Sequence, residues 1–132
     1  MPGELILIVE DNEKNRKLVR DVLARYGYRL AEAETGEDGV RLARELRPDL
    51  ILMDIQLPGI DGVTALGQIR SDPMLSETPV IAVTASAMSP DRRRIMEAGF
   101  DGYESKPISV RPFLENVRQM LDRRRPRGEA TS

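Results

Sequence analysis

Asp54 closes the apolar run LILM of residues 50–53, a position in which burying a charged side chain is costly. Such a carboxylate stays ionised only if a cation or hydrogen-bond donors compensate it. Glu10 and Asp11 close a second apolar run, residues 5–9. If the two runs are neighbouring strands of one sheet, the three carboxylates converge. In a chain without His or Cys, the cation that suits them is Mg²⁺, which binds oxygen ligands and keeps several waters.

Two further polar residues end later apolar runs. Thr84 closes the run VIAVT, and Lys106 follows the segment GYES. At the same edge of a sheet, their hydroxyl and ammonium groups would bind the oxygens of a phosphoryl group held on Asp54. Taken singly, each residue has a structural explanation, because acids commonly cap helices or start turns, Thr suits strands and Lys is usually solvated. The set of five polar residues at successive strand ends favours a phosphoryl-accepting site.

Short apolar runs alternate with amphipathic helical patterns along the chain. The expected strands are residues 5–9, 29–33, 50–53, 80–83 and 101–104. A helical pattern follows each of them, with expected N-caps that include Asp11 or Asn12, Thr35, Ser89 and Ser109 and expected ends at Gly27, Pro48 and Gly99. The sequence therefore predicts five βα units in succession.

Strands that are apolar throughout belong to a sheet covered on both faces, and strict βα alternation makes that sheet parallel. We therefore expect an α/β fold with a doubly wound five-stranded parallel sheet in the flavodoxin-like order 2-1-3-4-5. In this topology the ligand crevice lies at the carboxyl ends of strands one and three. Asp54 is expected at that crevice.

The composition sets limits on partners and location. The chain has 132 residues, with 20 Lys and Arg against 22 Asp and Glu and a net charge of −2, so no general attraction to nucleic acid or an anionic membrane is expected. We expect one domain at residues 1–122, no room for a separate output domain, and a basic disordered tail at residues 123–132. The first apolar run is too short for a signal peptide or membrane span, so a cytoplasmic protein is expected.

The motifs VEDN, LILMDIQLPGIDG, VIAVTA and YESKPI, in this order and spacing, resemble the CheY-like receiver domain of two-component response regulators. The resemblance extends from residue 5 to about residue 121. It implies a phosphoprotein of a phosphorelay signal transduction system, in which Asp54 accepts a phosphoryl group from a histidine kinase or a histidine phosphotransfer protein. It also implies Mg²⁺ as cofactor. Within the family, the phrases VEDNEKN, VTASAM and SKPISVRPFLE resemble single-domain regulators of the DivK type.

The resemblance assigns the metal site residue by residue. Glu10 and Asp11 correspond to the acidic pair of the family, with Glu10 in place of a second Asp and reaching the metal through water. Asp11, Asp54 and the backbone carbonyl of Gln56 are the implied direct Mg²⁺ contacts. The implied protein is not an enzyme, with slow self-dephosphorylation at most, for which Gln56 could orient the water.

The resemblance also assigns a switch. Thr84 and Lys106 are implied to bind the phosphoryl oxygens, and a cis peptide is implied between Lys106 and Pro107. New charge at Asp54 should draw Thr84 inward and make room for Tyr103, the implied switch aromatic. The implied kinase-docking surface includes Pro58, Pro107 and first-helix residues near Asn15 and Val19.

Two enzyme or cofactor-binding classes fit the sequence poorly. A haloacid-dehalogenase-like phosphatase needs a second Asp two residues after its nucleophile, where this chain has Gln56. A nucleotide or flavin site would place a phosphate where Glu10 and Asp11 repel it. A third alternative stays open, namely a scaffold of the same fold that binds a kinase or another regulator without being phosphorylated.

Overall fold

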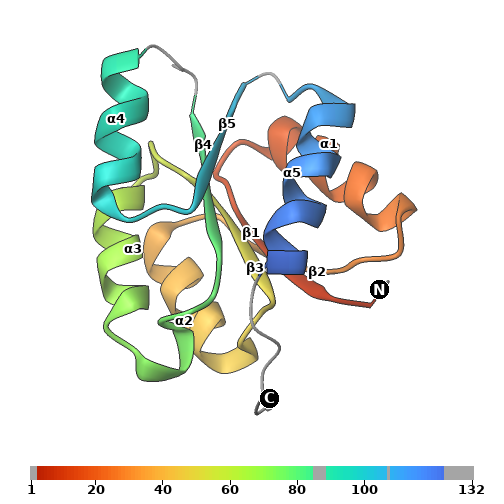
Figure 1. The fold of residues 1–132 in the computed structure, drawn as a ribbon. Coiled ribbons are helices and arrows are strands. Elements are labelled where there is room, and N and C mark those ends of the chain that lie inside the picture. Colours follow the sequence, from red (N-terminus) through yellow and green to blue (C-terminus); the bar gives the residue numbers. More distant parts are fainter. Residues whose placement is uncertain (1–2, 85–88, 107, 124–132) are drawn as a thin grey trace.

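The computed structural model describes residues 3–84, 89–106 and 108–123, and Figure 1 shows their arrangement. The strands are β1 (Leu5–Val9), β2 (Arg29–Ala33), β3 (Leu50–Asp54), β4 (Val80–Thr84) and β5 (Gly102–Ser105). The helices are α1 (Glu13–Arg25), α2 (Gly36–Leu46), α3 (Gly62–Arg70), the short 3₁₀ helix η1 (Pro73–Leu75), α4 (Ser89–Ala98) and α5 (Val110–Arg123). All neighbouring strands pair in parallel in the order β2-β1-β3-β4-β5, which confirms the predicted fold.

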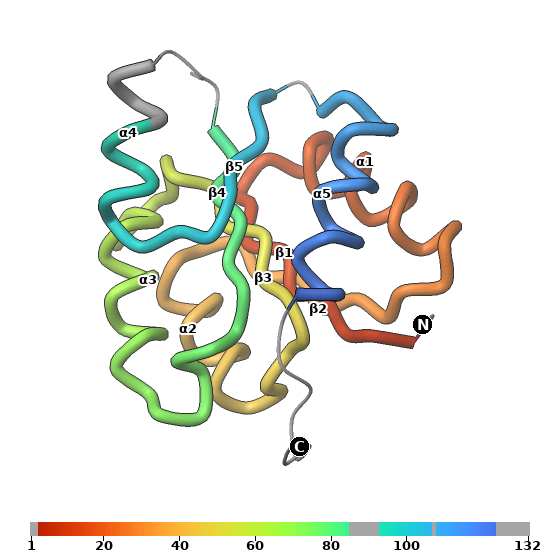
Figure 2. Tube along the Cα trace, viewed as in Figure 1, coloured from red at the N-terminus to blue at the C-terminus, as the bar shows by residue number. Residues whose placement is uncertain are grey.

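Helices cover both faces of the sheet. Helices α2, α3 and α4 lie on one face, while α1 and α5 lie on the other (Figures 1 and 2). Successive side chains of a strand point to opposite faces, so alternate residues of β3 enter different cores. Ile51 and Met53 join the core under α2, α3 and α4, whereas Leu50 and Leu52 join the core under α1 and α5. Burial on both faces explains why the strands read as continuous apolar runs.

Local side-chain hydrogen bonds fix the helix starts. Asn12 caps α1 by accepting a hydrogen bond from the Asn15 N–H at 3.0 Å, and Thr35 caps α2 in the same way. The predicted cap at Thr35 is thus confirmed. Of the two cap candidates for the first helix, Asn12 takes the role. The carboxylate of Asp11 is therefore not used as the cap.

The structure differs from the expected elements at several boundaries. Strands β3 and β4 run one residue further than expected, so Asp54 and Thr84 belong to the strands. Both residues are buried, and ladder pairing extends to them. Strand β5 begins and ends one residue later than expected, and η1 was not predicted. Pro107 and residues 124–132 lie outside the described residues, so the expected cis peptide between Lys106 and Pro107 and the expected disordered tail stay predictions.

The register of the sheet aligns its carboxyl-terminal edge. Val9 pairs with Met53, so Glu10 follows β1 at the level of Asp54. Thr84 pairs with Ser105, so Lys106 follows β5 next to the end of β4. Among the described residues, no helix is both long and apolar enough to cross a membrane.

Candidate functional site

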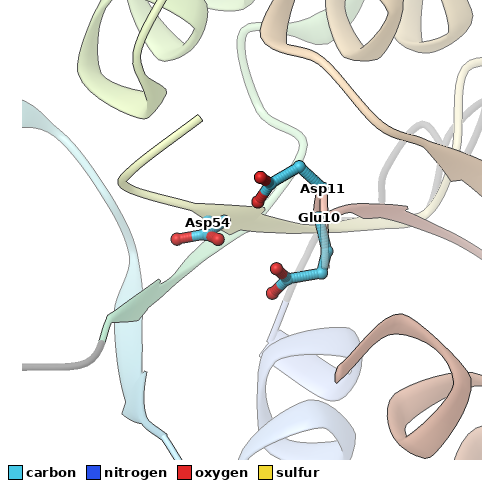
Figure 3. Close-up of side chains that lie close together, drawn as sticks. All are labelled: Glu10, Asp11 and Asp54. Atoms are coloured by element: carbon cyan, nitrogen blue, oxygen red, sulfur yellow. The ribbon is translucent and has the colours of Figure 1, made fainter. Parts of the chain in front are cut away.

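Three carboxylates meet at the ends of β1 and β3. One carboxylate oxygen from each of Glu10, Asp11 and Asp54 lies within 4.8 Å of the other two. In Figure 3 the side chains of Glu10 and Asp11 extend from the end of β1 toward the side on which Asp54 lies. Glu10 and Asp54 are 5% and 4% exposed, whereas Asp11 is exposed. The cluster is therefore buried at its base and reaches solvent at Asp11.

Asp54 has a donor on each of its carboxylate oxygens. Lys106 Nζ lies 2.9 Å from Oδ2, and the Gln56 N–H donates to Oδ1 at 3.0 Å. The hydrogen bond from Gln56 closes the side-chain turn that an acid at a strand end commonly makes. Asp54 therefore has a structural role in this turn and is also a member of the acidic cluster. These donors compensate a charge that burial alone would disfavour.

Lys106 bridges two of the acids. Its Nζ lies 3.1 Å from Glu10 Oε1 as well as 2.9 Å from Asp54 Oδ2. Burial acts to lower the pKa of Lys106, but its hydrogen bonds to Asp54 and Glu10 outweigh burial, so the pKa is raised and the ammonium stays charged. Burial raises the pKa of Glu10, and the Asp54 charge adds to this effect, against hydrogen bonds from Asn12 and Lys106. Lys106 thus contacts two of the three carboxylates with a single ammonium.

The donor set fits a hard divalent cation. All three groups are carboxylates, and Mg²⁺ prefers oxygen ligands at about 2.0–2.1 Å. Oxygens around one such ion lie within about 4.2 Å of each other, twice that bond length. Since the three carboxylate oxygens already lie within 4.8 Å, small side-chain movements would bring them to one ion.

Two of the remaining predicted residues lie on the neighbouring strands β4 and β5, and one lies in the loop after β3. Thr84 is 8% exposed, and its carbonyl accepts the Lys106 N–H at 2.8 Å, which ties the two residues together through the backbone. Tyr103 is partly buried and packs against the core under α2, α3 and α4. Gln56 is exposed in the loop after β3. Their assigned functions stay predictions. Thr84 ends β4 and Gln56 follows β3 at the edge that carries the acids, whereas Tyr103 pairs with Ala82 inside the sheet.

Glycines let the loop after β3 pack closely against the end of β3 and the start of α2. The Gly62 N–H donates to the Ile55 carbonyl at 2.9 Å, and a Cβ at Gly62 would lie 2.5 Å from the main-chain oxygen of Asp54. Gly59 has a φ of +77°, and the Glu37 carboxylate at the start of α2 accepts the Ile60 N–H at 3.2 Å. The loop that carries Gln56 is thus anchored to both β3 and α2.

Sequence reasoning missed Arg16, whose side chain is buried next to the acidic pair. Arg16 stands three residues before Val19 and seven before Leu23, and these three are the buried residues of α1. The spacing of Arg16 from Val19 and Leu23 could have revealed it, because it places a charged residue on the buried face of the helix. A buried arginine requires hydrogen-bonding partners.

The fold and the acidic edge define a class of signalling protein. Residues 6–118 match the family model of the response regulator receiver domain, and the chain belongs to this family. The chain is 48% identical over 116 residues to the polar-differentiation response regulator DivK of Brucella anthropi. This match covers 88% of this chain and 94% of that relative. DivK of Brucella ovis is 47% identical over the same length.

Solved structures with the same fold agree with this assignment. A Chloroflexus aurantiacus J-10-fl protein described as a response regulator superposes with a TM-score of 0.88 at 29% identity, covering 92% of this chain and 99% of that one. The receiver domain of the sensor histidine kinase PA1611 from Pseudomonas aeruginosa PAO1 gives a TM-score of 0.85 at 35% identity, covering 91% and 98%. That structure has a magnesium ion coordinated in its active-site cleft. Receiver domains of this family bind Mg²⁺ at the acidic site, interact with kinases and phosphotransfer proteins, and are in general not enzymes.

Proposed function

We propose that this protein is a stand-alone response regulator of a cytoplasmic phosphorelay, which accepts a phosphoryl group from a phosphohistidine onto Asp54 with Mg²⁺ as cofactor. The observation that carries the proposal is the pairing of buried Asp54 with Lys106 Nζ at 2.9 Å beside two further carboxylates. The histidine belongs to a histidine kinase or a histidine phosphotransfer protein. One receiver domain, residues 1–122, would perform this step.

The chemistry follows from the groups on the page. A carboxylate oxygen of Asp54 forms a bond to phosphorus while the phosphorus–nitrogen bond of the phosphohistidine breaks, and the leaving imidazole takes up a proton. Lys106 turns its ammonium from the carboxylates toward the transferring oxygens, and the Thr84 hydroxyl donates to one of them. When bound, Mg²⁺ would supply positive charge against the acids and the transferring oxygens.

The product would change the surface of the protein. A phosphoryl group on Asp54 adds negative charge and acceptor oxygens one strand away from Thr84. Movement of Thr84 toward these oxygens would free space beside Tyr103, which packs partly buried on the α4 side of the sheet. The two positions of Tyr103 would bias the surface of α4, β5 and α5 toward binding or releasing a protein partner.

The docking surface for the phosphohistidine protein would surround the acidic edge. Pro58 is exposed and Asn15 is partly exposed, in line with the expected surface. Val19 is 6% exposed and belongs to the core, whereas its neighbour Leu18 is 40% exposed. We therefore assign the apolar contact on α1 to Leu18, which is free to bury its side chain against a partner.

Intact-mass spectrometry after incubation with acetyl phosphate tests the proposal. Wild-type protein should gain one phosphoryl group in the presence of Mg²⁺ and lose this gain with EDTA. Asp54→Asn should gain none. Asp61→Asn is the matched control, because Asp61 caps α3 in the adjoining loop and Asn is an equally good cap, so this variant should be phosphorylated like the wild type.

Two outcomes would contradict the proposal. A gain that survives in Asp54→Asn would place the acceptor elsewhere. No gain in the wild type from acetyl phosphate or a phosphorylated histidine phosphotransfer protein would favour the alternative function, a receiver-fold scaffold that binds a kinase or another regulator without phosphorylation.

A further inference from the structure

The guanidinium of Arg16 contacts the backbone of the acidic pair. Its side chain is 9% exposed, and Nη1 donates to the main-chain carbonyl of Glu10 at 2.9 Å. This carbonyl belongs to the peptide that joins Glu10 to Asp11. Arg16 therefore holds the peptide from which the Asp11 side chain projects.

The Glu10 carbonyl lies where the ladder of the sheet stops. The Glu10 N–H donates to the Ala33 carbonyl of β2 at 2.9 Å, and the two polar groups of one extended residue point to the same side. Strand β2 ends at Ala33, so it offers no further ladder partner on that side. Arg16 supplies the donor that the next strand residue would otherwise provide, and a buried carbonyl of this kind needs one.

Acidic groups around Arg16 fix its guanidinium in place. Nε donates to Glu32 Oε1 at 3.0 Å, while Nη2 lies 3.7 Å from Glu13 Oε1 and 3.7 Å from Glu34 Oε2. Arg20 shares the same Glu32 oxygen at 2.8 Å. These acids balance the charge of Arg16, so its effect on the site is mainly geometric.

The carboxylate of Asp11 depends on this backbone support. In the described part of the chain, no hydrogen bond or ion pair holds the Asp11 carboxylate itself, unlike those of Glu10 and Asp54. Its direction is set by the turn from Glu10 to Asn12. Arg16 fixes the first peptide of that turn, and the Asn12 N–H donates to Glu10 Oε2 at 3.1 Å.

We propose that Arg16 is a positioning residue that aims the Asp11 carboxylate at the cation site by fixing the Glu10–Asp11 peptide. The inference rests on the proposed function, in which Asp11 contacts Mg²⁺. Residues that orient metal ligands from behind have large effects, since their replacement typically weakens metal affinity about 10–100-fold.

Mg²⁺ affinity of the unphosphorylated protein, measured by isothermal titration calorimetry, is the direct readout. Arg16→Gln should weaken the Mg²⁺ affinity about 10–100-fold. The ammonium of Arg16→Lys could contact the Glu10 carbonyl or Glu32, but it lacks the planar group with which arginine contacts both. The Mg²⁺ affinity of Arg16→Lys should therefore lie between those of the wild type and Arg16→Gln.

Arg70→Gln is the matched control. Arg70 also donates to a main-chain carbonyl, that of Thr78, at 2.5 Å and to the carboxylate of Asp101 at 2.7 Å. These contacts lie at the start of β4, the opposite edge of the sheet from the acids. Loss of either arginine should lower the melting temperature, but Arg70→Gln should leave the Mg²⁺ affinity unchanged.

Unchanged Mg²⁺ affinity in folded Arg16→Gln, or an equal loss in Arg70→Gln, would overturn the inference. If Arg16→Gln does not fold, Arg16→Lys decides, since an Mg²⁺ affinity equal to that of the wild type would equally overturn it. A wild type that binds Mg²⁺ but takes no phosphoryl group would overturn the proposed function and leave the comparison of affinities intact. A wild type that binds no Mg²⁺ would overturn both.

Discussion

At the scale of single residues, Lys106 determines the resting electrostatics of the site. Its ammonium lies between Asp54 and Glu10 and compensates two buried carboxylates at once. The same group is proposed to bind the incoming phosphoryl oxygens. In the proposed reaction, these two ion pairs would give way to contacts between the ammonium and the phosphoryl oxygens.

Replacing Lys106 by Met should therefore destabilise the protein in a metal-dependent way. Without Mg²⁺, two buried carboxylates lose their shared donor, and the free energy of unfolding should fall by about 1–3 kcal/mol. Added Mg²⁺ should restore part of this loss because its charge replaces that of the ammonium, while phosphorylation by acetyl phosphate should drop sharply. Urea denaturation with and without Mg²⁺ measures the first effect.

Lys17→Met is the control for this prediction. Lys17 pairs with Asp21 at 2.6 Å on the exposed face of α1, where water and salt screen the ion pair, so Lys17→Met should leave the stability nearly unchanged. A loss of stability in Lys106→Met that is the same with and without Mg²⁺ would show that the metal does not replace the charge of the ammonium.

Glu104 provides a pH-dependent prediction. Burial raises its pKa, although the Asn116 side chain donates to Oε2 at 2.8 Å and opposes the shift. A carboxyl whose folded-state pKa is raised binds its proton more tightly in the folded protein, so its contribution to stability falls as pH rises from 4.5 through the raised pKa. Glu104→Gln keeps the acceptor for Asn116 and should melt at a higher temperature than the wild type at neutral pH.

The difference in melting temperature between Glu104→Gln and the wild type should shrink as pH falls through the raised pKa of Glu104 toward the ordinary glutamate value of 4.5. Thermal melts from pH 4 to pH 8 follow it. Glu115→Gln, a change on the exposed surface of α5, should follow the wild-type curve throughout. A difference in melting temperature between Glu104→Gln and the wild type that stays constant with pH would show that packing, not ionisation, causes it.

At the scale of elements, the loop between β3 and α3 carries Gln56 and Pro58 across the acidic edge and is held by α2. Glu37 accepts the Ile60 N–H at 3.2 Å and lies against Gly59. The position of the loop thus depends on a contact between two βα units. Rearrangement of this loop would break its contacts with Glu37 at the start of α2.

Gly59→Ala should loosen this contact. Its φ of +77° costs an L-residue about 1–2 kcal/mol, and the added Cβ would lie 2.5 Å from Glu37 Oε1. We expect a loss of at least that size in urea denaturation. Gly67→Ala is the control, with a change expected in the opposite direction. A Cβ at this position in α3 would meet nothing within 4 Å, so the free energy of unfolding should rise by about 0.5–1 kcal/mol. Equal stability of the two variants would contradict the prediction.

The elements also show why the sequence predicted some features and missed others. The cap at Thr35 and the acids at Glu10 and Asp54 could be predicted because strand period and capping are local properties of the chain. The burial of Arg16 could not, because its partners lie on β2 and at the end of β1 and become neighbours only after the sheet forms. Likewise, η1 is three residues long, too short for a helical period to reveal it.

At the scale of the whole molecule, the sheet separates two apolar cores, and none of the described residues belongs to both. Neither core includes the acids, since Asp54 is the last residue of β3 and Glu10 and Asp11 directly follow β1. The fold therefore depends little on the cation, and the cation site depends fully on the fold.

Mg²⁺ should raise the melting temperature without being required for folding. A ligand that binds only the folded state at 100 times its dissociation constant adds about 2.7 kcal/mol. We expect EDTA to leave the protein folded and Mg²⁺ to shift the melt upward, as followed by circular dichroism. Asp11→Asn should remove most of this shift. A similar upward shift in NaCl of matched ionic strength would mean that screening, not binding, is responsible.

The two outer strands of the sheet have a consequence for behaviour at high concentration. An open strand edge is a template on which another chain can add, and charged side chains or short length guard against this. Strand β5 has four residues, and β2 carries exposed Arg29 and also Glu32, which Arg16 and Arg20 hold in place. The charge of Glu32 thus also opposes edge-to-edge aggregation through β2. Neutralising it should lower the solubility of the protein and, through Arg16, disturb the position of the Asp11 carboxylate.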